Sequence, residues 1–315
     1  MDPIIDKVDP KLVEQELTEE FFLRPTNKAG NYIYDVSAAE APNTMREIAR
    51  LREESYRPCG GSTGKSMDMD RFDTMTPPYR QIVVWDAEAR EIIGGYRYIL
   101  GKDVRFKTNG QPRLSSSHIF QYSDRFMQEF LPYGVELGRA FVQPNYTRRE
   151  AGMKALFALD NIWDGIGAVI HHHHVRFLFG KVTTHPTYPV LPRDLLYAYL
   201  EQYFTNRHHL VEPKQPHHPS PEAYELARKV LTANDPTEDL HNLQLAIRET
   251  GSVLSPMFSA YLNLTNRLTY FGSTPNSELN GAYESGIMID VNDIYPDKIE
   301  RYTQPYLEWL KQQKK

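Results

Sequence analysis

Two short stretches of this sequence combine carboxylates and arginines at close spacing. Asp70 and Asp73 are three residues apart in MDMDRFD, and Glu136 and Arg139 are three apart in VELGRAF. A carboxylate beside a bound substrate can accept a proton from it, directly or through a water molecule. An arginine can bind a carboxylate through two parallel hydrogen bonds. These residues therefore favour proton transfer on a small charged molecule.

The second stretch belongs to a segment, 135–170, that predicts a strand, a basic turn and a long helix. The strand 135–142 is β-branched and apolar around its charged pair, and Pro144 ends it. A basic turn at a helix N-terminus is a common site for a phosphorylated cofactor. The helix is indicated by apolar residues at helical spacing, which are Leu156, Leu159, Trp163, Ile166 and Ile170.

Composition limits the class of protein. The 315 residues are 40% hydrophobic and 24% charged, which is ordinary for a globular chain of one elaborated domain or two. The net charge of −5 argues against nucleic acid as a partner. A single cysteine, Cys59, fits a reducing cytoplasm, and we find neither a signal peptide pattern nor an apolar run of about 18 residues. We therefore expect a cytoplasmic protein.

The remaining elements predict a mixed sheet. Strands alternate with helices, which is typical of an α/β fold, but two early strands at 81–85 and 92–100 are joined by a tight turn. This combination favours a mixed sheet with helices on both faces. Further helices are expected at 10–22, 44–56, 192–204, 256–264 and 306–315, with two more inside 221–250.

Several motifs resemble one family. They are MDMDRFD (67–73), GGYRYIL (94–100), SHIFQYS (117–123), VELGRAFVQPNY (135–146) and FGKV (179–182). In order and spacing they are similar to the ornithine-lipid and glycine-lipid N-acyltransferases of the GNAT superfamily, often labelled hemolysins. The resemblance implies a GNAT-like, mostly antiparallel central sheet with helices on both faces. It places a helical extension at 1–30, the acyltransferase domain at 31–295 with a helical insertion at about 205–250, and a C-terminal helix at 296–315.

The resemblance also implies an activity. Family members move a fatty acyl group, often 3-hydroxylated, from acyl carrier protein or coenzyme A to the α-amine of an amino acid. Glycine or ornithine is the expected acceptor, aminolipid synthesis the expected process, and a peripheral contact with the inner membrane is compatible with a lipid product. No tightly bound cofactor and no metal are expected. Two alternatives remain: an enzyme like the acyl-homoserine-lactone synthases, using S-adenosylmethionine, and a non-catalytic GNAT module that binds acyl groups.

The acyl-homoserine-lactone synthases share part of this pattern: an arginine, an aspartate pair, a second arginine and a Glu-x-x-Arg strand. The matching positions here are Arg52, Asp70, Asp73, Arg97, Glu136 and Arg139.

Glu136 is the expected base, because the attacking amine must lose its proton before it can be acylated. On a regular strand Glu136 and Arg139 would point to opposite faces, so we expect a β-bulge near Gly138. The alternative is a cross-sheet ion pair from Glu136 to Arg97.

The other four positions have two interpretations. Arg52 and Arg97 could bind the acceptor carboxylate, and Asp70 and Asp73 could recognise the amine or support the two arginines. Alternatively, the aspartates only cap a helix or loop.

For the acyl donor, Arg149, Gly152 and Lys154 form R-x-x-G-x-K, an incomplete match to the GNAT pyrophosphate motif. Together with Arg148 they could bind the phosphopantetheine phosphate and acidic surface of acyl carrier protein. The alternative is a solvated charged turn.

Two further motifs resemble binding sites, but neither of them predicts one. CGGSTGKS (59–66) resembles a phosphate-binding loop, but Cys59 replaces its first glycine and a helix precedes it where a strand is needed. We interpret it as a mobile flap beside the acceptor. The run His171 to His174 is not by itself a metal site.

Overall fold

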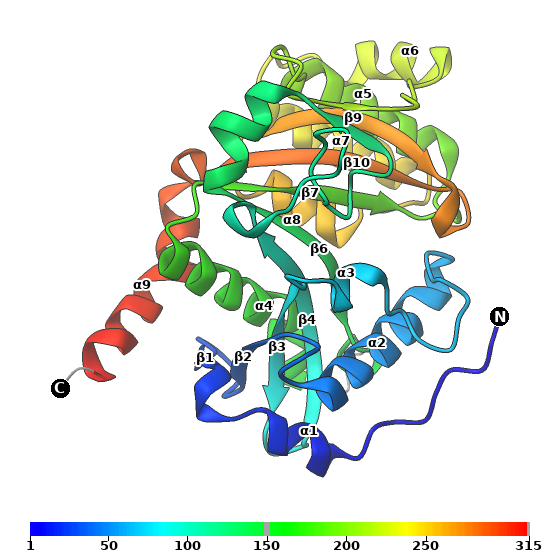
Figure 1. Cartoon of the computed structure of the whole chain (residues 1–315). Helices are drawn as coiled ribbons and strands as arrows, with labels where there is room; N and C mark the ends of the chain where they lie inside the picture. The colour runs from blue at the N-terminus through cyan, green and yellow to red at the C-terminus, as the bar shows by residue number, and fades with distance from the viewer. Residues whose placement is uncertain (148–151, 314–315) are drawn as a thin grey trace.

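An eight-stranded sheet runs through the molecule in the order β1-β2-β3-β4-β6-β7-β10-β9 (Figure 1). The computed structural model describes residues 1–147 and 152–313. All neighbouring strands are antiparallel except β6 and β7, so the predicted mixed, mostly antiparallel sheet is confirmed. The strands are β1 Phe22–Pro25, β2 Tyr32–Val36, β3 Arg80–Asp86, β4 Glu91–Leu100, β6 Gly134–Val142, β7 Phe177–Thr184, β9 Thr269–Asn276 and β10 Ala282–Asp290.

Helices cover both faces of the first half of this sheet. Side chains alternate along β3, so Ile82 and Val84 pack with α4, while Val83 and Trp85 pack with α1 and α2. One strand therefore contributes to the apolar clusters on both faces of the sheet. The helices are α1 Pro10–Glu16, α2 Pro42–Tyr56, α3 Arg71–Thr74, α4 Gly152–His173, α5 Val190–Phe204, α6 Pro221–Val230, α7 Pro236–Glu249, α8 Pro256–Leu262 and α9 Pro296–Gln313.

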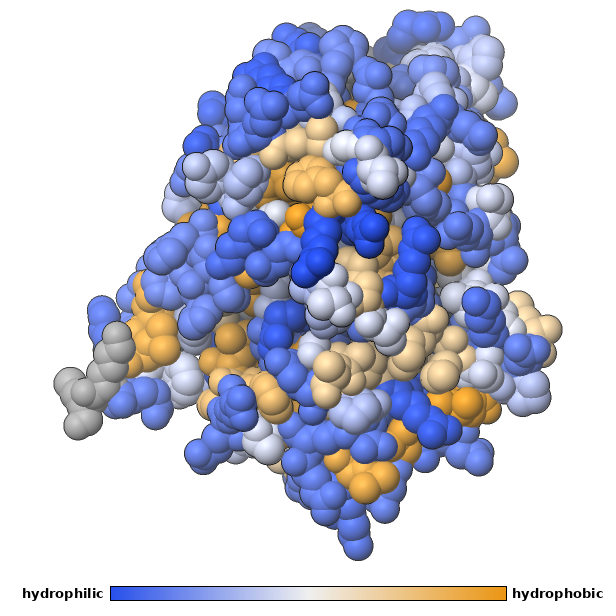
Figure 2. Space-filling model, in the orientation of Figure 1, coloured by the Kyte–Doolittle hydropathy of each residue, from blue (hydrophilic) through white to orange (hydrophobic). Residues whose placement is uncertain are grey.

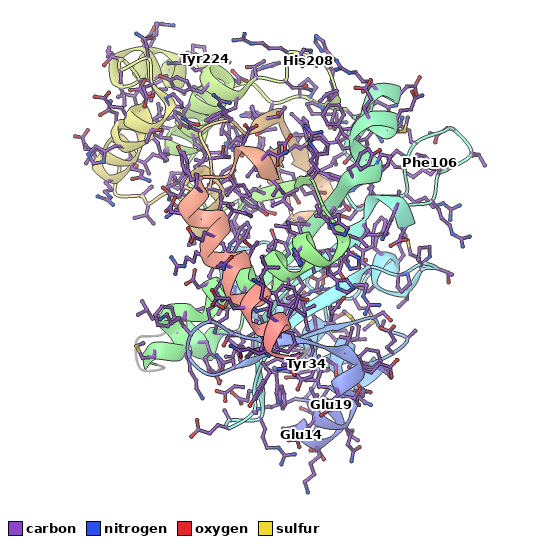
Figure 3. The ribbon with its side chains drawn as sticks, turned by 90° about the vertical axis from the view of Figure 1, so that its left-hand side faces the viewer. Glu14, Glu19, Tyr34, Phe106, His208 and Tyr224 are labelled. Carbon is purple, nitrogen blue, oxygen red and sulfur yellow. The ribbon has the colours of Figure 1, made fainter. Side chains whose placement is uncertain are left out.

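The second half, β7, β10 and β9, has its own supporting layers. Helices α5, α7 and α8 contribute to the main core on one face. The other face is covered by the segment 101–133 and by β5 (Phe120–Tyr122), which pairs with β8 (Val211–Pro213) in a separate two-stranded sheet. Helix α9 lies against α4 (Figure 3). Within the described ranges, no helix is both long and apolar enough to cross a membrane.

Two expected segments differ in detail. The helix predicted at 10–22 ends at Glu16, and Phe22–Pro25 instead forms the edge strand β1, so the region 1–30 contributes to the main sheet. The region 205–250 contains the helices α6 and α7 as expected, but β8 precedes them. Both strands have only three or four residues, too few for a periodic pattern to show.

Candidate active site

The two halves of the sheet separate where β6 and β7 stop pairing. Four residue pairs join these strands, from Gly134 with Phe177 to Leu137 with Gly180. Beyond them β6 is also irregular, because two residues of β6, Arg139 and Ala140, lie opposite a single residue of β4, Tyr96. The extra residue follows Gly138, and Arg139 has a φ of 54° there. The predicted bulge near Gly138 is confirmed.

A pocket of about 850 Å³ occupies this separation. One wall comes from residues 67–72, Arg97 and the bulge 138–140, and the other from 181–183, Asn276, Glu278 and Glu284. On the face shown in Figure 2, hydrophobic residues meet strongly hydrophilic ones across the middle of the molecule, where the two halves approach each other. The pocket therefore offers both charged and apolar contacts, as ligand sites usually do.

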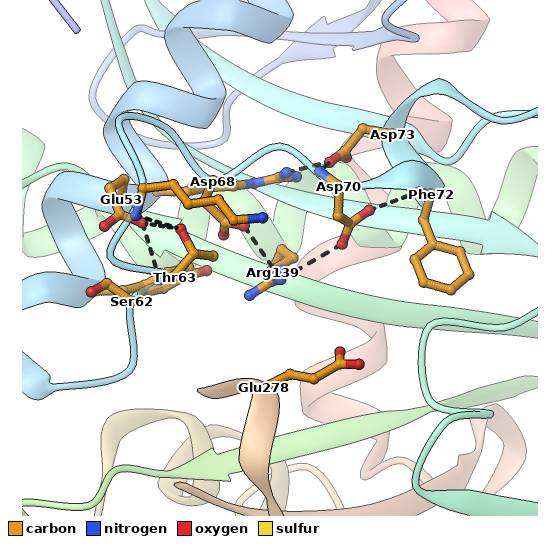
Figure 4. Close-up of polar contacts among 12 residues, drawn as sticks. Glu53, Ser62, Thr63, Asp68, Asp70, Phe72, Asp73, Arg139 and Glu278 are labelled. Atoms are coloured by element: carbon orange, nitrogen blue, oxygen red, sulfur yellow. Dashed lines mark hydrogen bonds and ion pairs between the residues drawn. The ribbon is translucent and has the colours of Figure 1, made fainter. Parts of the chain in front are cut away.

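The charged wall is a chain of alternating arginines and aspartates (Figure 4). Asp73 lies 3.2 Å from both Arg52 and Arg97. Arg97 continues to Asp70 at 2.8 Å, and Arg139 lies 3.6 Å from Asp70. The last member is Asp68, 3.3 Å from Arg139.

The neighbouring arginines keep Asp70 and Asp73 ionised. Burial alone would raise the pKa of Asp73, but the neighbouring Arg52 and Arg97 guanidinium groups hold it well below its ordinary value. Asp70 behaves similarly: burial opposes ionisation, and Arg97 lowers its pKa. Fixed ion pairs of this kind favour a preorganised site.

Only part of the predicted cluster reaches the pocket. Asp70, Arg97 and Arg139 line it, whereas Arg52 and Asp73 lie behind them, each fully buried. Arg52 donates to Asp73 and to Gln81, so the prediction that it binds the acceptor carboxylate is wrong.

Asp70 and Asp73 cap helix α3 and also pair with the arginines, so both interpretations of the two aspartates apply. The Phe72 N–H donates to Asp70 at 2.8 Å, and the Asp70 N–H donates to Asp73 at 3.0 Å. This reciprocal pair caps α3 and fixes both carboxylates in front of the arginines.

Glu136 requires a correction. It is 1% exposed and does not line the pocket. Its carboxylate accepts hydrogen bonds at 3.1 Å from the N–H groups of Ser115 and Ser116, and others from their hydroxyls and from Tyr79. Its cross-strand partner is Ile99, on the face covered by the segment 101–133. Glu136 therefore cannot contact an acceptor directly, and it makes no ion pair with Arg97.

The opposite wall holds residues to which the sequence analysis gave no role. Lys181 pairs with the buried Glu284 at 3.2 Å, and the Thr183 hydroxyl donates to the same carboxylate at 3.0 Å. His118 and His185 also line the pocket. His118 and Lys181 occur inside the family motifs SHIFQYS and FGKV, which was the available signal.

The loop 59–66 does lie beside the pocket, where Gly61, Thr63 and Lys65 contribute to its lining. It follows a helix, so it is no phosphate-binding loop of the strand-to-helix type. Glu53, buried on α2, accepts hydrogen bonds from the N–H groups of Thr63 at 3.1 Å and Gly64 at 3.0 Å. The expected flap is thus tethered to α2.

The described part of the predicted donor-binding turn, Gly152 and Lys154, lies away from this pocket. Arg148 and Arg149 fall outside the described residues. Gly152 begins α4, and Lys154 pairs with Asp86 at 2.6 Å and Glu88 at 3.1 Å near the β3–β4 turn. Neither Gly152 nor Lys154 lines the pocket.

The aromatic residues of α4 and β7 do not line the pocket. Trp163 and Phe177 are buried in the two main apolar clusters, and neither they nor Phe157 line the pocket. Apolar lining comes instead from Met67, Met69, Met257 and Leu279, among others. As for metals, the residues described here include no group of three or more histidine, cysteine or acidic side chains placed to hold one.

Antiparallel strands that lead into a bulge, followed by a parallel partner that separates from it, define a GNAT-type acyltransferase. Residues 51–158 match the family described as "Acetyltransferase (GNAT) domain". The chain is 45% identical over 309 residues to a glycine N(alpha)-acyltransferase of Bacteroides thetaiotaomicron, covering 98% of this chain and 91% of that protein. It is 40% identical over 309 residues to another of that name from Phocaeicola vulgatus, covering 98% and 94%. The chain belongs to this family of N-acyltransferases.

Among solved structures, BjaI, a CoA-dependent acyl-homoserine lactone synthase, is similar with a TM-score of 0.37. The two are 12% identical, and the match covers 88% of this chain and 90% of that one.

Proposed function

We propose that this protein transfers a fatty acyl group from a thioester to the α-amine of glycine. The observation that carries the proposal is the pocket between β6 and β7, which has a wall of paired charges facing a second polar wall. Glycine is the acceptor in the names of both relatives. A zwitterionic amino acid needs a cation for its carboxylate and an acceptor for its amine proton, and the pocket offers both kinds of group.

We assign the acceptor carboxylate to Arg139, with Arg97 beside it. Arg139 lies at the bulge and lines the pocket between Asp68 and Asp70. Arginine suits this role because its planar fork matches a carboxylate. Asp70 and Asp73 hold the two guanidinium groups in position, which is the support that a preorganised site requires.

The thioester is proposed to enter along the open edges of β6 and β7. Beyond Leu137 and Gly180 these edges no longer pair with each other. Methionines in the lining suit a flexible acyl chain, whose burial contributes about 0.8 kcal/mol per CH₂. The acyl group can come from acyl carrier protein or coenzyme A, and we expect it to be 3-hydroxylated. A lipid product also suggests a peripheral contact with a membrane, in aminolipid synthesis.

One assay tests the proposal. The purified protein is incubated with long-chain acyl carrier protein or acyl-coenzyme A and with glycine, ornithine or other amino acids, and products are identified by mass spectrometry. We expect N-acylglycine as the main product, with faster turnover from one of the two donors. A lactone formed from S-adenosylmethionine would instead support the synthase alternative. Tight donor binding without product from any amine would support the non-catalytic alternative.

A further inference from the structure

We propose that His118, through its Nε2 atom, accepts the proton that the acceptor amine loses during acyl transfer. This inference rests on the proposed function and assigns a catalytic residue that neither the sequence motifs nor the names of the relatives identify. It also replaces Glu136 in that role, since the Glu136 carboxylate is closed off from the pocket.

The orientation of the His118 ring is fixed by the backbone. Its Nδ1 atom lies 2.7 Å from the Ser115 carbonyl oxygen, which can only accept a hydrogen bond. Nδ1 must therefore carry the proton in the neutral ring, and Nε2 carries the lone pair. Ser115 is itself held by Glu136, so the buried carboxylate positions the turn that positions the histidine.

The Nε2 atom is buried and accepts no hydrogen bond from the described residues, and the Asn276 side chain lies close enough to stabilise the protonated ring. His118 lines the pocket, and the nearest acidic atom to Nε2 is Glu278 Oε2, 3.7 Å away. The Glu278 side chain is 75% exposed, so it can swing away and admit an amine. An unpaired acceptor in a buried site is costly unless a ligand supplies the missing donor.

The charges around the ring favour its neutral form before reaction. Burial lowers the pKa of His118, and the Lys181 ammonium on β7 lowers it further. The Ser115 carbonyl, Glu278 and the Asn276 side chain act in the opposite direction, and the nearby Glu284 pairs with Lys181. Near pH 7 the ring is therefore able to accept a proton.

The transfer balances as follows. Glycine arrives mostly as ammonium and releases one proton to solvent before attack. The nitrogen lone pair then forms the C–N bond to the thioester carbonyl carbon, and a second ammonium proton passes to His118 Nε2. The C–S bond breaks with its electron pair on sulfur, and the thiolate takes the proton held by the imidazolium. The products are N-acylglycine, a free thiol and one proton released to solvent.

His185 is the competing histidine in the same pocket. Its Nδ1 also makes no hydrogen bond to a described residue. No hydrogen bond fixes its second nitrogen among the described residues, and its ring packs so closely on Gly61 that a Cβ added there would lie 2.3 Å from Nδ1. His118 has both the fixed tautomer and the free acceptor.

The test measures kcat and KM for glycine across pH 5 to 9 in the wild type and in His118→Gln, His185→Gln and His218→Gln. Because the glycine amine must itself lose a proton, kcat/KM should fall about tenfold per pH unit below the amine pKa in every variant. In wild type this fall should steepen, as an additional acidic limb, below an apparent pKa that is lower than the ordinary histidine value of about 6.5. His118→Gln should lose about 10²- to 10⁴-fold in kcat and lose that acidic limb, while the KM for the donor stays within a few-fold. His218 is 73% exposed, and its variant should match the wild type.

Added imidazole should partly restore His118→Ala, because it can occupy the vacated space as a base. Retention of kcat and of the acidic limb by His118→Gln, or their loss in His185→Gln alone, would overturn the inference. If a His118 variant fails to fold, the wild-type profile decides, because a rate without the additional acidic limb excludes a histidine base. A wild type that is inactive towards every amine would overturn both the proposed function and this inference. If the wild type is active and substitution of His118 changes neither kcat nor its pH dependence, only the inference is overturned.

Discussion

At the scale of single residues, Glu136 shows how a buried carboxylate can serve a reaction that it does not touch. It gathers hydrogen bonds from Ser115, Ser116 and Tyr79 around one carboxylate. These bonds are strong because the acceptor is charged, at about 1.5–3 kcal/mol each to a charged group. The result is a rigid turn immediately before His118.

We predict that Glu136→Gln lowers both stability and kcat, by about 1–3 kcal/mol and at least tenfold, because the amide must turn a donor towards groups that already donate. The acidic limb of the pH–rate profile should remain, since His118 is still present. Thermal unfolding and steady-state kinetics across pH measure both effects. Loss of the acidic limb in this variant, with unchanged stability, would return the base role to Glu136.

The ion pairs of Asp73 make the free energy of unfolding depend on pH in acid. Its pKa in the folded protein lies below the unfolded value of about 3.9, because Arg52 and Arg97 outweigh the effect of burial. The ion pairs therefore stabilise the fold fully above that value and lose their contribution as the pH falls towards the folded pKa. Breaking such a buried pair typically costs about 3–5 kcal/mol.

Urea unfolding at pH 7, 5, 4 and 3 should accordingly show Asp73→Asn much less stable than wild type at pH 7, with a difference that shrinks under acid. Asp297→Asn, at a side chain that is 71% exposed, is the matched control and should track the wild type. A constant difference across pH would contradict the assigned charge state.

At the scale of elements, the site depends on how closely β6 and β7 approach before they separate. A Cβ added at Gly180 would lie 2.3 Å from the Leu137 carbonyl oxygen, whereas one added at Gly138 would meet nothing within 4 Å. We predict that Gly180→Ala costs about 1–3 kcal/mol of unfolding free energy and weakens donor binding, because it forces the last paired residues apart. Gly138→Ala should leave the unfolding free energy near wild type. Equal stability of the two variants in chemical denaturation would argue against this packing.

The sequence predicted the long elements well because their patterns are long. The strand 135–142, the helix that follows it and the hairpin before it all show regular spacing of apolar residues. The bulge was expected from the conflict between Glu136 and Arg139, and it is present, but it does not bring the two side chains together, because Arg139 lines the pocket and Glu136 does not. Only half of the site could be predicted from the sequence. Asp70, Arg97 and Arg139 match the arginine and aspartate pattern of related enzymes, but His118 and Lys181 reach them through the parallel pairing of β6 with β7 and through the long segment 101–133. No local pattern encodes such contacts.

At the scale of the whole molecule, the N-terminal segment lies along the loop that borders the pocket. The Asp2 N–H donates to the Gly64 carbonyl at 2.8 Å, and the Ile5 N–H donates to the Ser66 carbonyl at 3.1 Å. Arg57 also donates to the carbonyls of Asp2 and Lys65. Glu53 and this segment therefore hold the loop from two sides.

We predict that deleting residues 1–8 raises the KM for glycine several-fold and speeds amide hydrogen exchange at 60–66, because half of the tether is lost. The unfolding midpoint should change little, since α1 still packs on α2. Exchange rates at 60–66 that match those of the full-length chain would show that the hydrogen bonds to Glu53 alone hold the loop in place.

The short pairing of β6 with β7 has an evolutionary consequence. Only four residue pairs join β6 to β7, and the pocket residues Asn276 and Glu284 belong to the β9–β10 hairpin on the far side of that junction. Substitutions confined to the β9–β10 hairpin can therefore remodel one side of the cleft while the Arg139 side keeps its geometry. Homologues that diverge in amine preference should differ mainly in residues 269–290, and exchanging that hairpin between two of them should carry the preference with it.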